Sequence, residues 1–234
     1  MGSPELAAPL TSLEAEGSVS AAQMREFWGQ ATHGDAVRLA MATLDSLIPG
    51  FTSTAPLTVG AVGSGLLLTA LQVASACTAP VSIVFAADPD VLANRASARL
   101  LALCGRPPAT RFSCAGSAEM ANTLWSSDLE VITLPCKAIA HGNQSYPEGV
   151  AAFLHCVYAT MAGAAIREPR AILFETSDGL WSLPREKAAV ESILLTACPR
   201  HAWSSIVICP SVHCGFPMRR SRVFYLGVLR CPTA

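Results

Sequence analysis

Short apolar runs alternate with longer segments of helical spacing along most of this chain, and this alternation constrains the fold more than any other feature. The runs have strand length, and their apolar residues are nearly continuous; they occupy 56–62, 81–87, 129–134, 170–176, 204–209 and 222–228. Helical patterns lie between them at 64–77, 90–105, 148–165 and 184–198, with a weak strand near 110–114 and a short helix near 117–125. Strands that are buried on both faces and separated by helices predict a doubly wound, mostly parallel α/β sheet.

The last two strands are joined without a long helix, so we expect the final strand to be antiparallel. The length of 234 residues suits one large domain with a sizeable core. We predict a flexible arm over 1–20, which is rich in small residues, and a single domain over 21–234. That domain divides into a helical lead-in at 21–50 and a core at 55–230.

Composition excludes several classes of protein. The net charge is −1 and only 14% of residues are charged, so no overall basic field indicates nucleic-acid binding. The nine cysteines are odd in number and lack zinc-site spacing, which predicts free thiols in a reducing compartment, nucleus or cytoplasm. The first residues have no basic segment and no long apolar run, so we expect no signal peptide there, and we expect no membrane span. One local basic face is expected, because 199–234 contains arginines but no Asp or Glu.

Two loops at the carboxyl ends of the first strands have the composition of a cofactor site. The turn after the first strand reads GAVGSG, residues 60–65, and Asp88 and Asp90 follow the second strand. Glycines let the backbone approach a ligand, and a carboxylate at this place can accept hydrogen bonds from ribose hydroxyls. An adenosine-containing cofactor and a plain packing turn are both consistent with this pattern. No Lys-Ser or Lys-Thr pair follows the glycines, which disfavours a P-loop nucleotide site.

A nucleophile, an acid and a group of cations end the later strands. Pro135 and Cys136 follow the strand at 129–134, and Glu175 ends the strand at 170–176. Arg219, Arg220 and Arg222 stand directly before the last strand. Ligands bind beyond the carboxyl ends of the strands in open α/β sheets, so we expect these side chains to face one site.

The order and spacing of these segments resemble the cytosine-C5 DNA methyltransferase family over about 57–229. GAVGSGLLLTAL resembles the family's glycine-rich S-adenosylmethionine (AdoMet) motif, and FAADPDVLA resembles its acidic motif. DLEVITLPCKAIAHGN resembles the Pro-Cys-Gln segment, AILFETSDGL the Glu-Asn-Val segment, and CGFPMRRSRVFYLG the Gln-Arg-Arg-x-Arg segment. The resemblance implies a Rossmann-like fold and an AdoMet site formed by Gly60, Ala61, Gly63, Gly65, Leu66, Asp88, Asp90 and Pro135.

The resemblance also implies a mechanism in which a cysteine activates the cytosine ring. Cys136 would add to C6 as a thiolate, so that C5 can take the methyl group. Glu175 would hydrogen-bond N3 and the exocyclic amine of a flipped-out base. Arg222 would contact the base carbonyl, while Arg220, as a further site residue, or Arg219 would hold phosphate or a neighbouring loop.

The chain departs from the family at several motif positions. Lys137 stands for the Gln, Ala140 for a Ser or Thr, Thr176-Ser177 for Asn-Val and Met218 for another Gln. No target recognition region follows the last strand, so we expect a partner subunit or a further segment to supply it.

Three functions stay open. The first is a cytosine-C5 methyltransferase core acting on DNA, with RNA as the other nucleic-acid candidate. The second is a catalytically inactive relative that serves as a regulatory or assembly subunit. The third is an AdoMet enzyme with a different acceptor.

Overall fold

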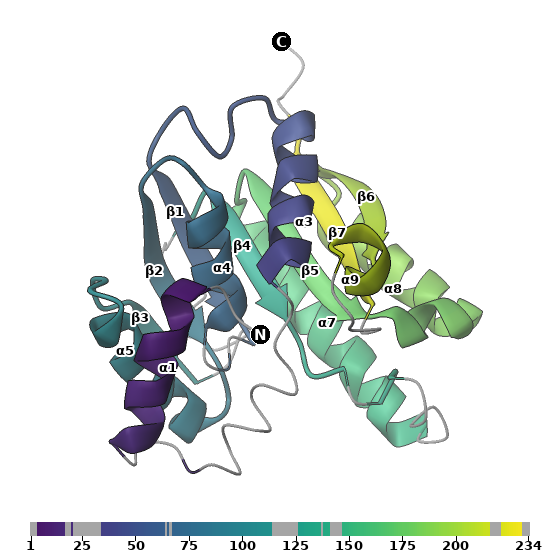
Figure 1. The fold of residues 1–234 in the computed structure, drawn as a ribbon. Helices are drawn as coiled ribbons and strands as arrows, with labels where there is room; N and C mark the ends of the chain where they lie inside the picture. Colours follow the sequence, from purple (N-terminus) through teal and green to yellow (C-terminus); the bar gives the residue numbers. More distant parts are fainter. Residues whose placement is uncertain are drawn as a thin grey trace.

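A seven-stranded mixed sheet forms the centre of the computed structural model, which describes residues 4–16, 20, 34–63, 65, 67–113, 126–136, 138–140, 147–215 and 221–230. Its strands are β1 (Leu57–Val62), β2 (Val81–Ala87), β3 (Thr110–Phe112), β4 (Leu129–Thr133), β5 (Ala171–Ser177), β6 (His201–Ile208) and β7 (Arg222–Leu229). They lie in the order β3-β2-β1-β4-β5-β7-β6 (Figure 1). Only β7 runs antiparallel to its neighbours, β5 and β6, which confirms the predicted fold class and the antiparallel final strand.

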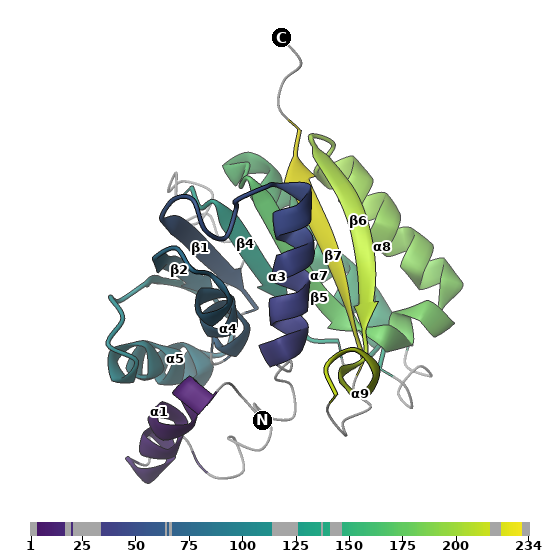
Figure 2. The same ribbon diagram turned by 45° about the horizontal axis from the view of Figure 1, so that its top comes forward.

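Helices cover both faces of the sheet (Figures 1 and 2). One layer holds α1 (Pro4–Ala15), α3 (Gly34–Leu47), α4 (Leu68–Ala76) and α5 (Val91–Leu103). The other holds α7 (Pro147–Arg167) and α8 (Pro184–Ala197). The 3₁₀ turn η1 (Asp178–Ser182) and the short helix α9 (Pro210–His213) follow β5 and β6.

The two layers explain why the strands read as nearly continuous apolar runs. Along β5, Leu173 belongs to the core beneath α3 and α4, while Ile172 and Phe174 belong to the core beneath α7 and α8. Successive side chains of a strand point to opposite faces, so a strand covered on both faces needs an apolar residue at every position.

Residues 4–15 form a helix, so the predicted flexible arm over 1–20 is wrong there. Leu6, Leu10 and Leu13 follow helical spacing and are almost fully buried, and α1 packs against α5. Glu16 also accepts hydrogen bonds from Arg99. Helix α3 covers 34–47 of the helical lead-in expected at 21–50, whereas the helical patterns at 21–33 and 117–125 lie outside the described residues.

Helix α7 meets the length and composition of a membrane span, although we expected no segment of the sequence to do so. Residues 149–166 carry no charge, and the helix is long and apolar enough to cross a membrane by length and composition alone. In the structure it packs beside α8, and Phe153, Val157 and Met161 are buried in the core beneath it. The core helix of a soluble protein passes the same test of length and composition, so this finding is weak evidence for a span.

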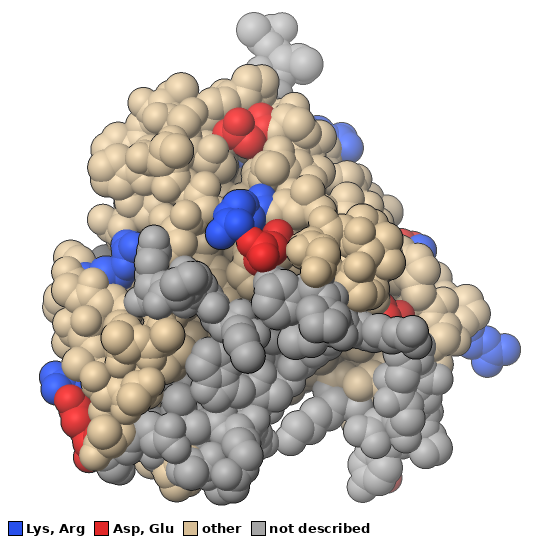
Figure 3. All heavy atoms as spheres, in the orientation of Figure 1, with Lys and Arg blue, Asp and Glu red and all other residues tan. Residues whose placement is uncertain are grey.

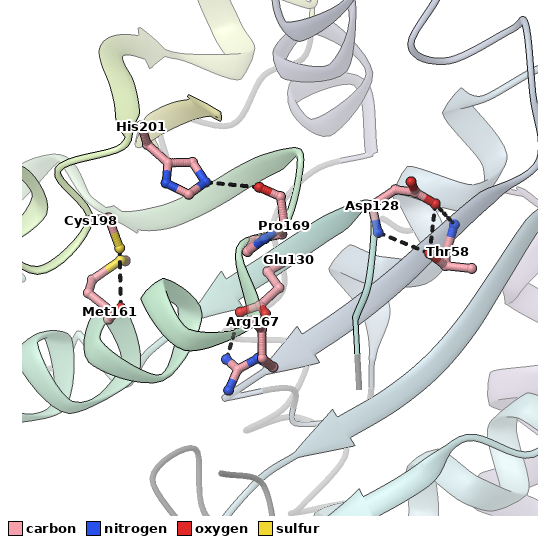
Figure 4. A network of polar contacts seen from close by, with 8 residues as sticks. All are labelled: Thr58, Asp128, Glu130, Met161, Arg167, Pro169, Cys198 and His201. Carbon is pink, nitrogen blue, oxygen red and sulfur yellow. Dashed lines mark hydrogen bonds and ion pairs between the residues drawn. The ribbon is translucent and has the colours of Figure 1, made fainter. Parts of the chain in front are cut away.

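A buried ion pair lies at the end of the sheet away from the carboxyl ends of the parallel strands. Arg167 donates from Nε and Nη2 to the two carboxylate oxygens of Glu130, at 2.5 and 2.8 Å, and both side chains are at most 4% exposed (Figure 4). The Arg167 guanidinium also lies 5.5 Å from the centroid of the Phe85 ring. The pair therefore joins α7 to β4 within the buried core.

Candidate functional site

The predicted site residues gather where the parallel strands end. Gly63 follows β1, Asp88 follows β2, and Pro135 and Cys136 follow β4. Glu175 lies near the end of β5, and Arg222 begins β7, which runs the opposite way. These positions form one edge of the sheet, as expected for ligand sites in open α/β folds.

The turn after β1 is held tightly between its two neighbouring strands. Gly63 donates from its backbone to the Ala87 carbonyl at 2.8 Å, and Thr133 Oγ1 donates to the Gly63 carbonyl at 2.8 Å. Gly63 has a φ of 63°, and an added Cβ would lie 2.5 Å from the Thr133 carbonyl oxygen. Only glycine fits this close approach, so the residue is required by the turn itself.

Gly60 and Ala61 lie within β1 and not in the turn. A Cβ on Gly60 would lie 2.1 Å from the ring of Phe85, so packing against this ring accounts for the glycine. Ala61 is 2% exposed and belongs to the core. The glycine-rich turn is therefore limited to the segment from Gly63 onward, which corrects the predicted extent of the loop.

Among the described residues, the space beside Gly65 is open. Its φ is 47°, and an added Cβ would meet no atom of these residues within 4 Å. The following Leu67 also has a positive φ, 62°, although it is not glycine, and it is 1% exposed. Such a conformation costs on the order of 1–3 kcal/mol and is common at functional sites. It also delays the start of α4 to Leu68, four residues after the predicted start; Leu66 lies outside the described residues.

The two acids after β2 have different roles in the fold. Asp88 is buried and accepts hydrogen bonds from the backbone of Gly65 at 2.7 Å and of Asp90 at 2.9 Å. Burial raises the pKa of the Asp88 carboxyl, against the lowering effect of these hydrogen bonds. Asp90 is exposed and caps α5 by accepting from Leu92 and Ala93. Asp88 therefore connects the ends of β1 and β2, whereas the Asp90 carboxylate is used by the helix.

Glu175 and Arg222 meet, although 47 positions separate them in the chain. Arg222 Nε donates to Glu175 Oε1 at 2.8 Å, and both side chains are 7% exposed. Arg222 lies opposite Ser177 in the antiparallel register, so the contact with Glu175 is a diagonal one on the same face of the sheet. Both residues lie on the face covered by α3, since their register neighbours Leu173 and Phe224 belong to that core. The structure thus brings together two of the predicted catalytic residues.

Cys136 lies at the start of the loop after β4. It is three residues beyond Thr133, which is the register partner of Glu175 in β5. Its carbonyl accepts hydrogen bonds from the backbone of Ile139 and Ala140, so a turn begins here. The residue is half-buried, outside any disulfide, and packs partly against the core beneath α7, while Pro135 is exposed. Lys137, His141, Arg219 and Arg220 lie outside the described residues.

Cys209 is a residue at this edge that the sequence did not single out. It directly follows Ile208, the register partner of Arg222, and its Sγ lies 3.1 Å from the Ser211 hydroxyl. Hydrogen bonds with Ser211 and Ser221 lower the pKa of this thiol to about 7. Its apolar flank VIC suggested a packing cysteine, and no local signal separates it from the buried Cys198.

We expect Cys209 to be the fastest of the described cysteines to react with iodoacetamide at neutral pH. The thiolate is the reactive form, so the rate should reach half its maximum near pH 7. Burial raises the pKa of Cys77 to about 11 and of Cys198 to about 12, so these two should stay unmodified. Peptide mapping by mass spectrometry measures each rate. A Cys209 rate that rises only near pH 8.5, about the value for an unperturbed thiol, would contradict the expected pKa.

Sequence comparison and structure comparison give different results for this chain. No model of a known protein family matches the sequence, and no curated protein matches it. Solved structures do match. A Listeria monocytogenes protein described as a class I S-adenosylmethionine-dependent methyltransferase superposes with a TM-score of 0.57 at 12% identity, over 86% of this chain. The fold is that of the class I methyltransferases.

Other solved structures with this fold support the same conclusion. A Klebsiella pneumoniae protein described as an O-methyltransferase has a TM-score of 0.54 at 12% identity and covers 99% of this chain and 92% of its own. A prophage protein of E. coli described as a DNA modification methyltransferase has a TM-score of 0.51 at 13% identity, over 74% of this chain and 47% of its own. This chain spans 61% of the length of the Listeria protein. At these identities the likeness establishes the fold and leaves the acceptor open.

Proposed function

We propose that this chain is an AdoMet-dependent cytosine-C5 methyltransferase core that acts on nucleic acid through a Cys136 adduct at C6. The observation that carries the proposal is the 2.8 Å contact between Glu175 and Arg222, at the edge of the sheet where the Cys136 loop begins. A buried acid held by an arginine, on the strand next to the one that leads into a thiol-bearing loop, suits the activation of a polar, electron-poor ring. Cys136 packs toward the core beneath α7 and the pair lies on the α3 face, so the mechanism requires the base to lie between them at the strand ends. The resemblance to the DNA enzymes favours DNA over RNA as the substrate.

The residues at the ends of β1 and β2 fit AdoMet. Asp88 provides a buried carboxylate for ribose hydroxyls. Gly63 and Gly65 have positive φ angles, which favour glycine, and without side chains they leave the backbone there uncovered. None of the described residues fills the space beside Gly65, which gives room for a ligand next to that backbone. AdoMet, when bound, supplies an electrophilic methyl group on its sulfonium. The remaining cofactor role predicted for Leu66 and Pro135 stays a prediction.

The proposed reaction uses three side chains of this chain in sequence. The Cys136 thiolate forms a bond to C6, and the electron pair released in the ring makes C5 nucleophilic, so that C5 takes the methyl group. Glu175 binds N3 and the exocyclic amine, and Arg222 holds the Glu175 carboxylate in place through Nε. Loss of the C5 proton to a base then expels the thiolate from C6 and restores the ring.

The charges of the described residues argue that a partner supplies most of the nucleic-acid affinity. On the face drawn in Figure 3, basic side chains are few and scattered. Within the described ranges, seven arginines and lysines form ion pairs with acids of the same chain. Phosphate contacts by unpaired cations provide most non-specific affinity. We therefore propose that a partner subunit or a further segment provides target recognition.

Trapping on an oligonucleotide that contains 5-fluorocytosine tests the proposed chemistry. Fluorine at C5 cannot leave as a proton does, so the adduct of Cys136 at C6 should persist once the methyl group has been transferred. We expect an AdoMet-dependent adduct, seen as a denaturation-resistant shift of the protein, with the wild type and none with Cys136→Ser. The oligonucleotide should be offered both as single strands and as duplex, in DNA and in RNA.

Cys209→Ser is the matched control, because it removes a second thiol at this end of the sheet, whose pKa is lowered to about 7. It should trap like the wild type. An adduct that survives in Cys136→Ser but disappears in Cys209→Ser would show that Cys209, and not Cys136, is the nucleophile. This result would overturn the mechanism.

A catalytically inactive relative is the second candidate, and one observation favours it. Thr176 replaces the family's Asn beside the acid, and its hydroxyl is buried without a hydrogen-bond partner among the described residues. This side chain therefore faces the core and cannot replace an amide at the site. Absence of an adduct on every oligonucleotide, together with AdoMet binding in calorimetry, would support this second function.

A further inference from the structure

The two outer strands of the sheet differ in how they are protected from pairing. Edge strand β3 has three residues, includes Arg111 and follows Pro107 and Pro108. Shortness, charge and proline are the usual means of blocking an exposed edge. Edge strand β6 is longer, and its eight residues, HAWSSIVI, contain no charge and no proline, so the prolines at this edge, Pro199 and Pro210, lie only beyond its two ends.

The β6 edge is also regular along its whole length. All eight residues pair with β7 in unbroken register, from His201↔Leu229 to Ile208↔Arg222, so no bulge turns the edge away. In the part of the chain that the structure describes, no strand pairs with the outer side of β6. Four of its residues are exposed, namely Ala202, Ser204, Ser205 and Val207. A strand of this kind is a ready template for a further strand.

The helix beside this edge is uncharged on its exposed positions after the first turn. Helix α8 runs along the β6 side of the molecule (Figure 2). Its exposed residues there are Ala188, Ser192, Leu195 and Thr196, and Leu195 is 58% exposed. The nearby charges Lys187 and Glu191 are paired with each other at 2.6 Å. An uncharged surface therefore continues from the strand to the helix.

We propose that β6 pairs antiparallel with β6 of a second copy of this chain, which joins the two sheets across a two-fold axis. A second copy is the occupant that fits, because an uncharged edge suffers no self-repulsion when it meets itself. A two-fold axis perpendicular to the sheet keeps α8 of both copies on the same side, where they can pack together. The axis can pass beside Ser204 or beside Ser205, which gives two registers. In each register the central serine lies opposite the same serine of the other copy, and its small side chain causes no steric conflict.

The size of this surface predicts a weak dimer. A strand edge of about 27 Å beside a helix of about 21 Å offers roughly 400 Å² per copy. That is about half of the ~800 Å² per partner of a stable interface, so we expect dissociation at micromolar concentration. The antiparallel pairing turns the two carboxyl edges in opposite directions. Neither copy then reaches the other's candidate site, so the proposal is independent of the proposed function.

Sedimentation velocity on the full chain, from about 2 to about 200 µM, tests the dimer across the micromolar range. The sedimentation coefficient of the wild type should rise with concentration toward that of a dimer. Ser205→Lys and Ser205→Glu should each weaken association roughly five- to tenfold, because like charges meet at the axis. An equimolar mixture of the two variants should restore association, because Lys now faces Glu.

Ser82→Lys and Ser82→Glu are the matched controls, because Ser82 is an exposed serine on β2, an inner strand. They should associate like the wild type, and far-ultraviolet circular dichroism verifies that every variant folds. A wild type that stays monomeric throughout the concentration range overturns the proposal. So does a mixture of folded Ser205 variants that fails to associate, or an equal loss in the Ser82 variants.

Discussion

Glu175→Gln is expected to lower the rate of methyl transfer about 10²- to 10⁴-fold, the usual range for losing a group that handles a proton. Glutamine has nearly the same shape, but it lacks the carboxylate that accepts the 2.8 Å hydrogen bond from Arg222 Nε and that would bind the cytosine ring. Single-turnover transfer of tritiated methyl from AdoMet to an oligonucleotide measures the loss.

Arg222→Lys tests the other half of the pair. Lysine keeps the charge but cannot reproduce the planar guanidinium contact that orients the Glu175 carboxylate. Because both side chains are 7% exposed, each variant also leaves a buried group poorly paired, and thermal unfolding must be followed in parallel.

The exposed ion pair between Arg200 and Glu168 provides the control for both variants. Its side chains are 51% and 40% exposed, so Arg200→Lys and Glu168→Gln should change neither the transfer rate nor the stability measurably. A folded Glu175→Gln protein that transfers methyl groups at the wild-type rate would show that this carboxylate takes no part in the reaction.

Arg167→Met is expected to lower the free energy of unfolding by about 3–5 kcal/mol. The substitution leaves the Glu130 carboxylate, which is fully buried, without its bidentate partner. At about 2–4 °C per kcal/mol for a chain of this size, the midpoint of thermal unfolding should fall by roughly 6–20 °C. Chemical denaturation of the purified chain measures the free energy directly.

The double variant Glu130→Leu with Arg167→Met tests whether the loss of stability comes from the unpaired Glu130 carboxylate. Apolar residues of similar size can replace both members of a buried pair at little cost, so most of the stability should return. Stability that falls further in the double variant would mean that the packing of Arg167 on the Phe85 ring, and not its charge, supports this region.

The candidate site could be predicted in part from the sequence. Cys136, Glu175 and Arg222 were chosen because each stands at the end of a strand, and the structure places the last two in direct contact. That contact depends on β7 lying between β5 and β6, a strand order that no local pattern encodes. Cys209 was missed because its pKa is lowered by side-chain hydrogen bonds with Ser211 and with Ser221, and the fold brings Ser221 in from twelve positions away.

The glycine-rich turn was also only partly predictable from the sequence. Glycines at 60, 63 and 65 looked equivalent in the sequence, but each has a different reason in the structure. Gly60 makes room for Phe85 and Gly63 for the Thr133 carbonyl, whereas no described residue lies close to the position of a Cβ on Gly65. The bond from Gly65 to Asp88 connects two loops, and spacing along the chain cannot reveal which of two nearby acids will make it.

The sequence by itself determined the layered α/β architecture, because burial on both faces of a strand demands continuous apolar residues and leaves an unmistakable pattern. It also placed the polar candidates at the strand ends. The tertiary structure alone decided which of them meet, that the first residues form a packed helix, and that β6 presents an unprotected edge. These outcomes depend on contacts between residues far apart in the chain, and local composition does not reveal such contacts.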